Sequence, residues 1–426
     1  MFNLKKSVFF AMLLVCLLAF VANGNEAFAK VAGKNIQDIN GDSKSDILYT
    51  PAGSLNPTVW FMDGTQIFLN PAPVSITGGT VPDATWFYVG TGDFNADGQF
   101  DLLYRNRVTS QFMVLTMNGS AVTAVSPAGA AANVIDSSWQ VRGIADFDGD
   151  GQSELLLQIS TGRDNLTNYT VAIAKFASNG LTIASLTNVV TLDNDDWKIL
   201  GTGNFTGSST GKSDILLMNT NPASAYAGNV VIWVMSGTSI TSVVNVASIG
   251  ATGLTNWQFI GQVTATTDNG IGVTSYVLNS TGDFDGNGFD DIAWVDTSAT
   301  ATNGQIYIWK MKAPTGSFSG SYLTDQWGVK KVLPSVVTFT PGGIGTLTFD
   351  TFVGIYDFDG DGRADILLQS SKTAGGTYPI EQWFIRGTNI TSDTVPTAPP
   401  VMLMRGVQER CSKSAVNPHD WQNCNY

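Results

Sequence analysis

The sequence predicts an all-β fold, a single β-propeller of four-stranded blades, and three observations lead to that prediction. Charged residues make up only 13% of the 426 residues while glycine numbers 45, a balance typical of strands joined by many turns. Hydrophobic residues at 43% and aromatic residues at 11% supply enough apolar surface for a packed core. An Asp-rich unit also recurs at intervals of about 53 to 79 residues, which suits a propeller blade.

The repeated unit is clearest at Asp357, where the sequence reads DFDGDGRADILL. Related units begin at Asp38, Asp93, Asp146 and Asp283, and a degenerate copy begins at Asn204. Each unit is expected to form four strands. A tryptophan seven residues before the Asp cluster opens the first strand in three units: Trp86, Trp139 and Trp197. The cluster leads into a short apolar second strand. A third strand then follows, as at 59–62, 231–235, 306–311 and 382–385, and a tight turn leads to the fourth.

Six clusters predict six blades; residues 312–351 are interpreted as an insertion and are the place where a seventh blade, the alternative, would lie. The long stretch between Trp257 and Asp283 is interpreted as an inserted hairpin. The alternatives are a β-solenoid, whose coils are shorter than these units, and a string of sandwiches, each needing about seven strands. The segment around Trp421 is similar to the openings of blades and is expected to pair with the first blade and close the ring.

The chain is expected to divide into three segments. Residues 1–29 have the pattern of a signal peptide: Lys5 and Lys6, an apolar run over 8–21, and a small-residue cleavage site at 27–29. Residues 30–400 would form the propeller, and residues 401–426 a tail held by a disulfide between Cys411 and Cys424. The sequence therefore predicts a secreted or extracytoplasmic monomer without a membrane span.

The Asp clusters carry the clearest chemical signal. Each intact copy places oxygen-bearing side chains at positions 1, 3, 5 and 9, with glycine favoured at positions 4 and 6, where a tight loop needs positive φ. Such oxygens suit Ca²⁺, which takes six to eight ligands in a flexible shell. The predicted ligands of about five ions are Asp38, Asn40, Asp42, Asp46, Asp93, Asn95, Asp97, Asp101, Asp146, Asp148, Asp150, Glu154, Asp283, Asp285, Asn287, Asp291, Asp357, Asp359, Asp361 and Asp365.

The acidity of the chain supports this interpretation. These positions hold 17 of the 35 acidic residues in a chain of net charge −13, so the loops would repel themselves without a cation. The same acidity argues against nucleic acid as a partner. The alternatives are Asp-rich turns that cap their own backbone, and Mg²⁺, which prefers a stricter octahedral shell. The copy at Asn204 has one carboxylate, Asp214, and a lysine, Lys212, so no metal is expected there.

These motifs resemble the FG-GAP repeat family, also called VCBS repeats, known from the integrin α-chain propeller and from bacterial secreted proteins. The shared pattern is D-x-[DN]-x-D-G-x-x-[DE] followed by I/L-L, with GDF leading at 92–94 and 282–284. The resemblance covers about 38–390. It implies a calcium-stabilised propeller whose structural cation loops lie on the face opposite the ligand site. The family includes adhesins, lectins and enzyme appendages.

The sequence is consistent with two functions. One is a lectin-like binding or adhesion module for carbohydrate or protein; the alternative is a polysaccharide-active enzyme, a lyase or hydrolase, on the same scaffold. The single histidine, His419, lies in the tail, and no catalytic residue is assigned. Trp60, Trp233, Trp309 and Trp383 are expected to pack between blades. Candidate ligand residues follow the second strands, on the face opposite the cation loops: Arg105, Arg107, Arg163 and Tyr169.

Overall fold

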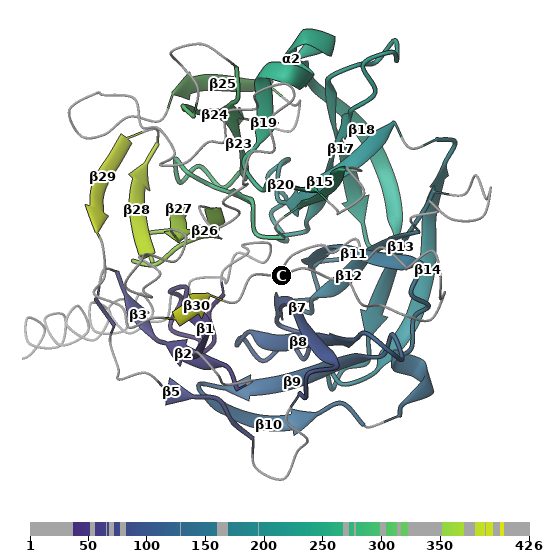
Figure 1. Cartoon of the computed structure of the whole chain (residues 1–426), viewed down its shortest axis with the longest axis vertical. Helices are drawn as coiled ribbons and strands as arrows, with labels where there is room; N and C mark the ends of the chain where they lie inside the picture. The colour runs from purple at the N-terminus through teal and green to yellow at the C-terminus, as the bar shows by residue number, and fades with distance from the viewer. Residues whose placement is uncertain are drawn as a thin grey trace, which may run out of the picture. The chain divides into compact units, whose positions relative to one another are not determined.

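Figure 1 shows the computed structural model, whose described residues all belong to the unit of residues 33–426. They are residues 37–51, 56–64, 66–67, 72–76, 82–127, 129–159, 169–194, 196–266, 272–276, 278–298, 304–312, 317–322, 352–369, 380–387, 389–394 and 401–403. The predicted signal peptide lies outside these residues, as do Arg163, Cys411, His419, Trp421 and Cys424. None of the helices that the structure describes is long and apolar enough to cross a membrane.

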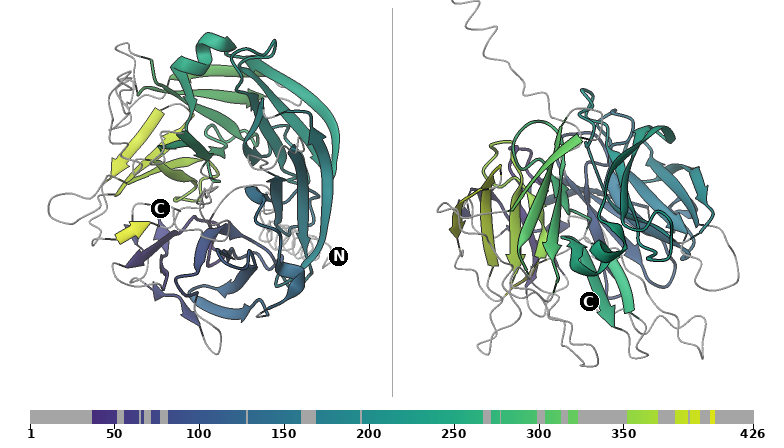
Figure 2. Two further views of the ribbon diagram at one scale, coloured as in Figure 1. Left: turned by 45° about the vertical axis from the view of Figure 1, so that its right-hand side comes forward. Right: turned by 90° about the horizontal axis from the view of Figure 1, so that it is seen from above.

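The described residues form six blade sheets that follow one another around a ring, as Figures 1 and 2 show, and two further two-stranded sheets. Blade 1 has the strand order β30 (Val401–Leu403), β1 (Ile47–Pro51), β2 (Thr58–Trp60) and β5 (Ala72–Pro73), and β3 (Met62–Asp63) forms a hairpin with β4 (Gln66–Ile67). Blade 2 contains β7 (Trp86–Gly92), β8 (Asp101–Asn106), β9 (Phe112–Asn118) and β10 (Ala121–Val125), to which β6 (Ser75–Ile76) adds a parallel strand. Blade 3 contains β11 (Trp139–Ala145), β12 (Glu154–Ile159), β13 (Tyr169–Phe176) and β14 (Ile183–Leu192), preceded by the 3₁₀ helix η1 (Ala131–Asn133).

The second half of the ring repeats this plan. Blade 4 contains β15 (Trp197–Gly203), β16 (Asp214–Asn219), β17 (Asn229–Ser236) and β18 (Ser239–Ser248), followed by helix α2 (Gly250–Asn256). Blade 5 contains β19 (Trp257–Phe259), β23 (Asp291–Asp296), β24 (Ile306–Lys312) and β25 (Ser317–Tyr322), and β22 (Thr281–Gly282) also pairs with β23. Blade 6 contains β26 (Phe352–Tyr356), β27 (Asp365–Gln369), β28 (Ile380–Arg386) and β29 (Asn389–Thr394).

The fold is therefore the predicted six-bladed propeller, with one correction in blade 5. The hairpin expected between Trp257 and Asp283 is present as β20 (Gln262–Thr266) and β21 (Gly272–Tyr276). The insertion expected at 312–351 is wrong in its first part, because β25 completes the fifth blade. A turn and a fourth strand are what the other blades show at this place, so this stretch belongs to the repeat.

The first blade draws strands from both ends of the propeller sequence. Strand β30 pairs antiparallel with β1, with Tyr49 opposite Leu403 and Pro51 opposite Val401. This pairing joins residues about 350 positions apart in sequence and closes the ring of sheets. The segment at Trp421, which was expected to close the ring, lies outside the described residues, and the closing strand begins 20 residues earlier.

The core lies between the sheets. Six clusters of buried apolar side chains each combine residues from two neighbouring blades. The second residue of each Asp loop is fully buried and anchors the loop to this core: Ile39, Phe94, Phe147, Phe205, Phe284 and Phe358. The predicted packing of the four strand tryptophans between blades is confirmed, since Trp60, Trp233, Trp309 and Trp383 are all buried in these clusters.

At Gly90 and Gly143, the glycine after the opening tryptophan lets neighbouring inner strands approach closely. The ladder of β11 and β12 shifts register between Val141 and Gly143, and a Cβ on Gly143 would lie 2.6 Å from Thr202 Cγ2 in the next blade. We expect Gly143→Ala to destabilise the fold by about 1–3 kcal/mol, because overpacking forces side chains or backbone to move.

Gly201→Ala is the matched control for this prediction. It lies at the equivalent place in blade 4, where the nearest atom to a new Cβ, Thr281 Cγ2, is 3.4 Å away. Thermal unfolding of both variants measures the effect. Equal melting temperatures for the two variants would show that the spacing between inner strands does not limit the residue at this position.

Candidate metal centres

The first aspartate of each intact loop organises the loop around its own carboxylate. In blade 3, Asp146 Oδ1 accepts a hydrogen bond from the Gly149 amide at 2.6 Å, and Oδ2 accepts one from the Gly151 amide at 2.9 Å. Both glycines have positive φ, 80° and 87°, which the wrap requires. Equivalent bonds from the amides at positions 4 to 6 reach Asp38, Asp93, Asp283 and Asp357.

The acidic residue at position 9 joins the loop to the sheet. Asp291 Oδ2 accepts from the Phe284 amide at 3.0 Å, and its Oδ1 accepts from the Met311 amide of the third strand at 2.7 Å. The same pair of bonds is made by Asp46, Asp101 and Asp365. Burial raises the pKa of each of these three carboxyls to about 8 against the opposing effect of the backbone bonds. Position 9 is therefore a buried acid that a nearby cation would help to ionise.

Backbone hydrogen bonds link all six loops into a closed ring. The carbonyl oxygen of position 1 accepts from the amide that directly precedes the last acidic residue of the loop in the following blade. The donor and acceptor pairs are Phe100 to Asp38 (2.8 Å), Ser153 to Asp93 (2.7 Å), Ser213 to Asp146 (2.8 Å), Asp290 to Asn204 (2.9 Å), Ala364 to Asp283 (2.7 Å) and Ser45 to Asp357 (2.7 Å). The last pair connects blade 6 to blade 1. The ring is therefore closed by a hydrogen bond between loops as well as by the pairing of β30 with β1.

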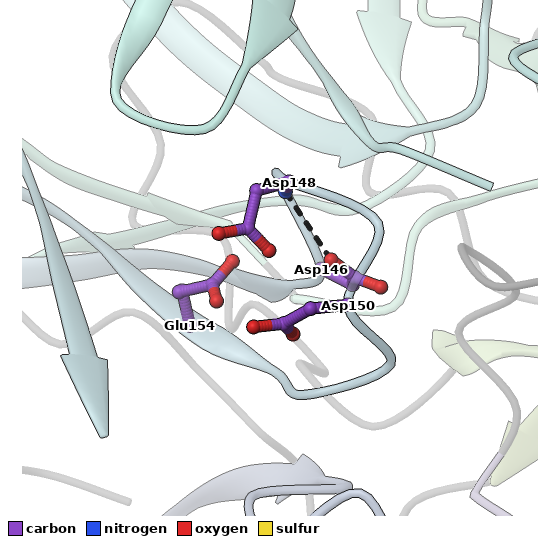
Figure 3. A group of neighbouring side chains, drawn as sticks. All are labelled: Asp146, Asp148, Asp150 and Glu154. Atoms are coloured by element: carbon purple, nitrogen blue, oxygen red, sulfur yellow. Dashed lines mark hydrogen bonds between the residues drawn. The ribbon is translucent and has the colours of Figure 1, made fainter. Parts of the chain in front are cut away.

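Three of the five predicted loops gather their carboxylates around a common point. Oxygens within 4.8 Å of one another come from Asp146, Asp148, Asp150 and Glu154 in blade 3, from Asp283, Asp285 and Asp291 in blade 5, and from Asp357, Asp359 and Asp361 in blade 6. Figure 3 shows the side chains of the blade 3 group turned toward one another. These three clusters could hold a metal ion.

Several oxygens in these clusters fit a cation better than a hydrogen-bonded turn. Asp148 Oδ1, Glu154 Oε1 and Asp285 Oδ1 are buried and accept no hydrogen bond. Glu154 is only 1% exposed, and burial raises its pKa to about 8. An unpaired buried carboxylate oxygen is costly, and a hard cation would satisfy several of them at once.

Basic side chains also reach these clusters, although the Asp-rich motif does not include them. Lys175 Nζ on β13 pairs with Asp148 and lies 3.3 Å from Asp150 Oδ2 and 3.7 Å from Glu154 Oε1. Lys310 occupies the equivalent place on β24, with its Nζ 3.8 Å from Asp285 Oδ2. This shared position in the third strand was visible in the sequence as a repeated lysine. A bound metal ion would share these carboxylates with an ammonium group or displace it.

The loops of blades 1 and 2 have the predicted spacing, but their carboxylates do not form such a group. The position 3 amides donate to position 5: Asn40 Nδ2 to Asp42 Oδ2 at 3.1 Å, and Asn95 Nδ2 to Asp97 Oδ2 at 2.9 Å. An amide nitrogen cannot ligate a cation, so these side chains would have to present their oxygens instead. The two loops are thus less prepared for a metal than the other three.

The degenerate loop of blade 4 uses its single carboxylate for structure. Asp214 accepts from the amide and hydroxyl of Thr206 at 3.2 and 2.7 Å and from the Met235 amide at 3.1 Å. Lys212 Nζ lies 3.2 Å from Ser236 Oγ. The loop therefore keeps the position 9 connection to the sheet while lacking the other acidic positions.

The predicted ligand-binding residues have different environments. Arg105 is a structural bridge rather than a surface group: it is buried, and its guanidinium donates to the carbonyls of Trp139 at 2.6 Å and Ile135 at 2.9 Å in blade 3. Arg107 lies over the Phe87 ring at 5.7 Å, and Tyr169 is a half-buried residue at the start of β13. The Arg105 side chain thus satisfies carbonyls at the start of the next blade.

Comparisons with known proteins found one repeat match and distant similarities to solved structures. Residues 38–104 match the FG-GAP-like repeat. Dihydro-heme d1 dehydrogenase NirN in complex with DHE is 11% identical, with a TM-score of 0.30, over 88% of this chain and 77% of that chain. The α-L-arabinofuranosidase Arb93A from Fusarium graminearum, solved with an iminosugar inhibitor, is 10% identical, with a TM-score of 0.35, over 76% of this chain and 94% of that chain. No curated protein matches the chain. The chain is a six-bladed β-propeller, and the repeat match at 38–104 supports one of the FG-GAP-like kind.

Proposed function

We propose that this chain is an exported, calcium-stabilised β-propeller that serves as a binding module for carbohydrate or protein. The observation that carries the calcium part is the set of buried carboxylate oxygens without hydrogen-bond partners in the gathered loops, on Asp148, Glu154 and Asp285. Ca²⁺ fits these loops better than Mg²⁺, because it accepts a flexible shell of six to eight oxygens.

Calcium in these loops has a structural role. Each loop connects the inner strand of a blade to the second strand, and position 9 connects it to the third strand through backbone bonds. An ion held by positions 1, 3, 5 and 9 therefore fixes three strands of one blade. Because the loops are hydrogen-bonded to one another around the ring, each ion also strengthens a contact with the next blade. The gathered loops of blades 3, 5 and 6 bind first, and the loops of blades 1 and 2 bind more weakly, giving about five ions.

The binding role is supported by the division of the molecule into two faces. The Asp-rich loops lie at one end of the inner strands. The opposite face of the propeller contains none of these loops, so its residues are available for a ligand. The signal peptide at 1–29 directs export, and a Cys411–Cys424 disulfide suits that oxidising compartment. Calcium concentrations outside the cell match sites with dissociation constants of about 10⁻⁴–10⁻³ M.

One experiment separates the binding module from the alternative enzyme. The secreted protein, in millimolar Ca²⁺, is applied to arrays of glycans and of extracellular proteins, and in parallel to polysaccharide substrates with detection of new reducing ends and unsaturated products. We expect saturable binding without product formation. Turnover of any polysaccharide would replace the binding-module proposal with the enzyme.

A further inference from the structure

A groove opens where the outer strand of blade 3 ends beside blade 4. It has two adjoining lobes with volumes of about 510 and 400 Å³, which share Leu192, Trp197 and Tyr226. Sites for small ligands have volumes of about 300–1,000 Å³, so the groove is large enough for several sugar rings. Of the candidate ligand residues that the structure describes, Arg105, Arg107 and Tyr169, none lines it, although Tyr169 pairs with Leu192 in the sheet.

The groove lies on the face opposite the calcium loops. Trp197 begins the inner strand β15, and Asn219 ends the second strand β16. The degenerate loop of the same blade, which begins at Asn204, joins the other ends of these two strands. A ligand in the groove therefore meets no metal centre, and its binding can be tested independently of the calcium sites.

The groove has exposed aromatic side chains. The rings of Trp197 and Tyr226 have centroids 6.4 Å apart at an angle of 38°, and Tyr226 is 60% exposed. Val243, on the neighbouring strand β18, is 56% exposed. An aromatic face carries partial negative charge, and the axial C–H groups of a pyranose ring carry partial positive charge. Such a surface suits stacking of a sugar ring.

A buried amide in the groove has a free donor. Asn219 is 1% exposed, and its Nδ2 makes no hydrogen bond, while its Oδ1 accepts from the Asn221 amide at 3.2 Å. Asp196, which also lines the groove, accepts from Asn221 Nδ2 at 2.9 Å through Oδ1. A hydroxyl group can accept from one partner and donate to another. An unpaired amide donor with a carboxylate acceptor nearby therefore fits a ligand rich in hydroxyls.

The charge of the groove selects the kind of saccharide. The described lining includes the carboxylates of Asp193 and Asp196 and no lysine or arginine. Acidic polysaccharides such as uronates would meet repulsion there, since their carboxylates need basic partners. We propose that this groove binds a neutral saccharide, with Trp197 and Tyr226 stacking on a sugar ring and Asn219 donating to a hydroxyl oxygen. This proposal rests on the proposed binding function and assigns it a site.

The test uses affinity electrophoresis of the full secreted chain in millimolar Ca²⁺. Gels contain galactomannan, arabinoxylan or laminarin as neutral probes, and polygalacturonate or alginate as acidic probes. Two variants remove different interactions: Tyr226→Ala removes the exposed ring, and Asn219→Asp removes the free donor while keeping an acceptor for Asn221. Val108→Ala is the control, because Val108 is 72% exposed and follows a second strand on the same face outside the groove.

We expect at least one neutral probe to retard the wild-type chain, with affinity reduced about tenfold in Tyr226→Ala and Asn219→Asp and unchanged in Val108→Ala. Melting curves establish that each variant is folded. Retardation by acidic probes alone would overturn the neutral ligand, and unchanged retardation of both variants would overturn the groove; either result leaves the binding module intact. Binding of a protein but no polysaccharide overturns the saccharide proposal, and binding of neither class on the gels or arrays overturns both proposals.

Discussion

Removal of calcium is expected to lower the melting temperature of this protein by roughly 5–8 °C. At a calcium concentration tenfold above the dissociation constant, each site contributes about 1.4 kcal/mol. Three gathered loops then contribute roughly 4 kcal/mol and five loops roughly 7 kcal/mol. An unfolding entropy of about 2.1 cal/mol/K per residue gives roughly 0.8 kcal/mol/K for a propeller of this size, which converts these energies into the expected shift.

Scanning calorimetry in chelator and in millimolar Ca²⁺ measures this shift. Mg²⁺ at the same concentration is the ionic control and is expected to restore little of the lost stability, since the loops do not impose its octahedral shell. Identical melting temperatures in chelator and in Ca²⁺ would falsify the structural role of the ions.

Two single substitutions are expected to separate metal binding from the structural role of the loop carboxylates. Asp285→Ala removes a carboxylate whose Oδ1 has no hydrogen-bond partner. This carboxylate accepts no hydrogen bond from a strand amide of the described residues. We expect the substitution to abolish one calcium site while leaving the melting temperature in chelator nearly unchanged. Asp214→Ala, in the degenerate loop, removes the acceptor of the Thr206 and Met235 amides. Because buried donors are left unpaired, we expect a loss on the order of 2–4 kcal/mol in chelator with unchanged calcium stoichiometry.

Each variant serves as the control for the other. Calcium content is measured by isothermal titration and stability by thermal unfolding. If Asp214→Ala lost a calcium ion, the blade 4 loop would be a metal site after all. If Asp285→Ala kept the full stoichiometry, the gathered carboxylates of blade 5 would be part of a turn rather than a ligand set.

The repeat made most of the fold predictable. Trp86, Trp139 and Trp197 each open an inner strand, and the Asp loops join first and second strands, because local turn chemistry and strand patterning agree at these places. Strand β30 could not be located in this way, since three residues without the repeat pattern form it and only a partner far away in sequence makes it a strand. The boundary at β25 was missed for a similar reason: its sequence SFSGSY has few of the apolar residues that mark other strands.

The candidate sites show the same limit. The spacing of the motif identified the acidic residues. It could not show that the carboxylate at position 9 accepts hydrogen bonds from backbone amides, or that Lys175 contacts the blade 3 cluster. Those facts depend on which third-strand residue lies beside the loop. The saccharide groove combines Leu192 of one blade with Trp197 and Tyr226 of the next, and packing between blades brings them together. The burial of Arg105 could not be predicted from spacing either, because its carbonyl partners belong to the neighbouring blade.

The most direct test of the calcium account is an anomalous difference map from crystals grown with calcium and measured at long wavelength. The account predicts peaks within the loops at Asp146, Asp283 and Asp357, weaker peaks at Asp38 and Asp93, and none at Asn204. A map without peaks in any of the Asp-rich loops would contradict it and leave these carboxylates as turns that cap their own backbone.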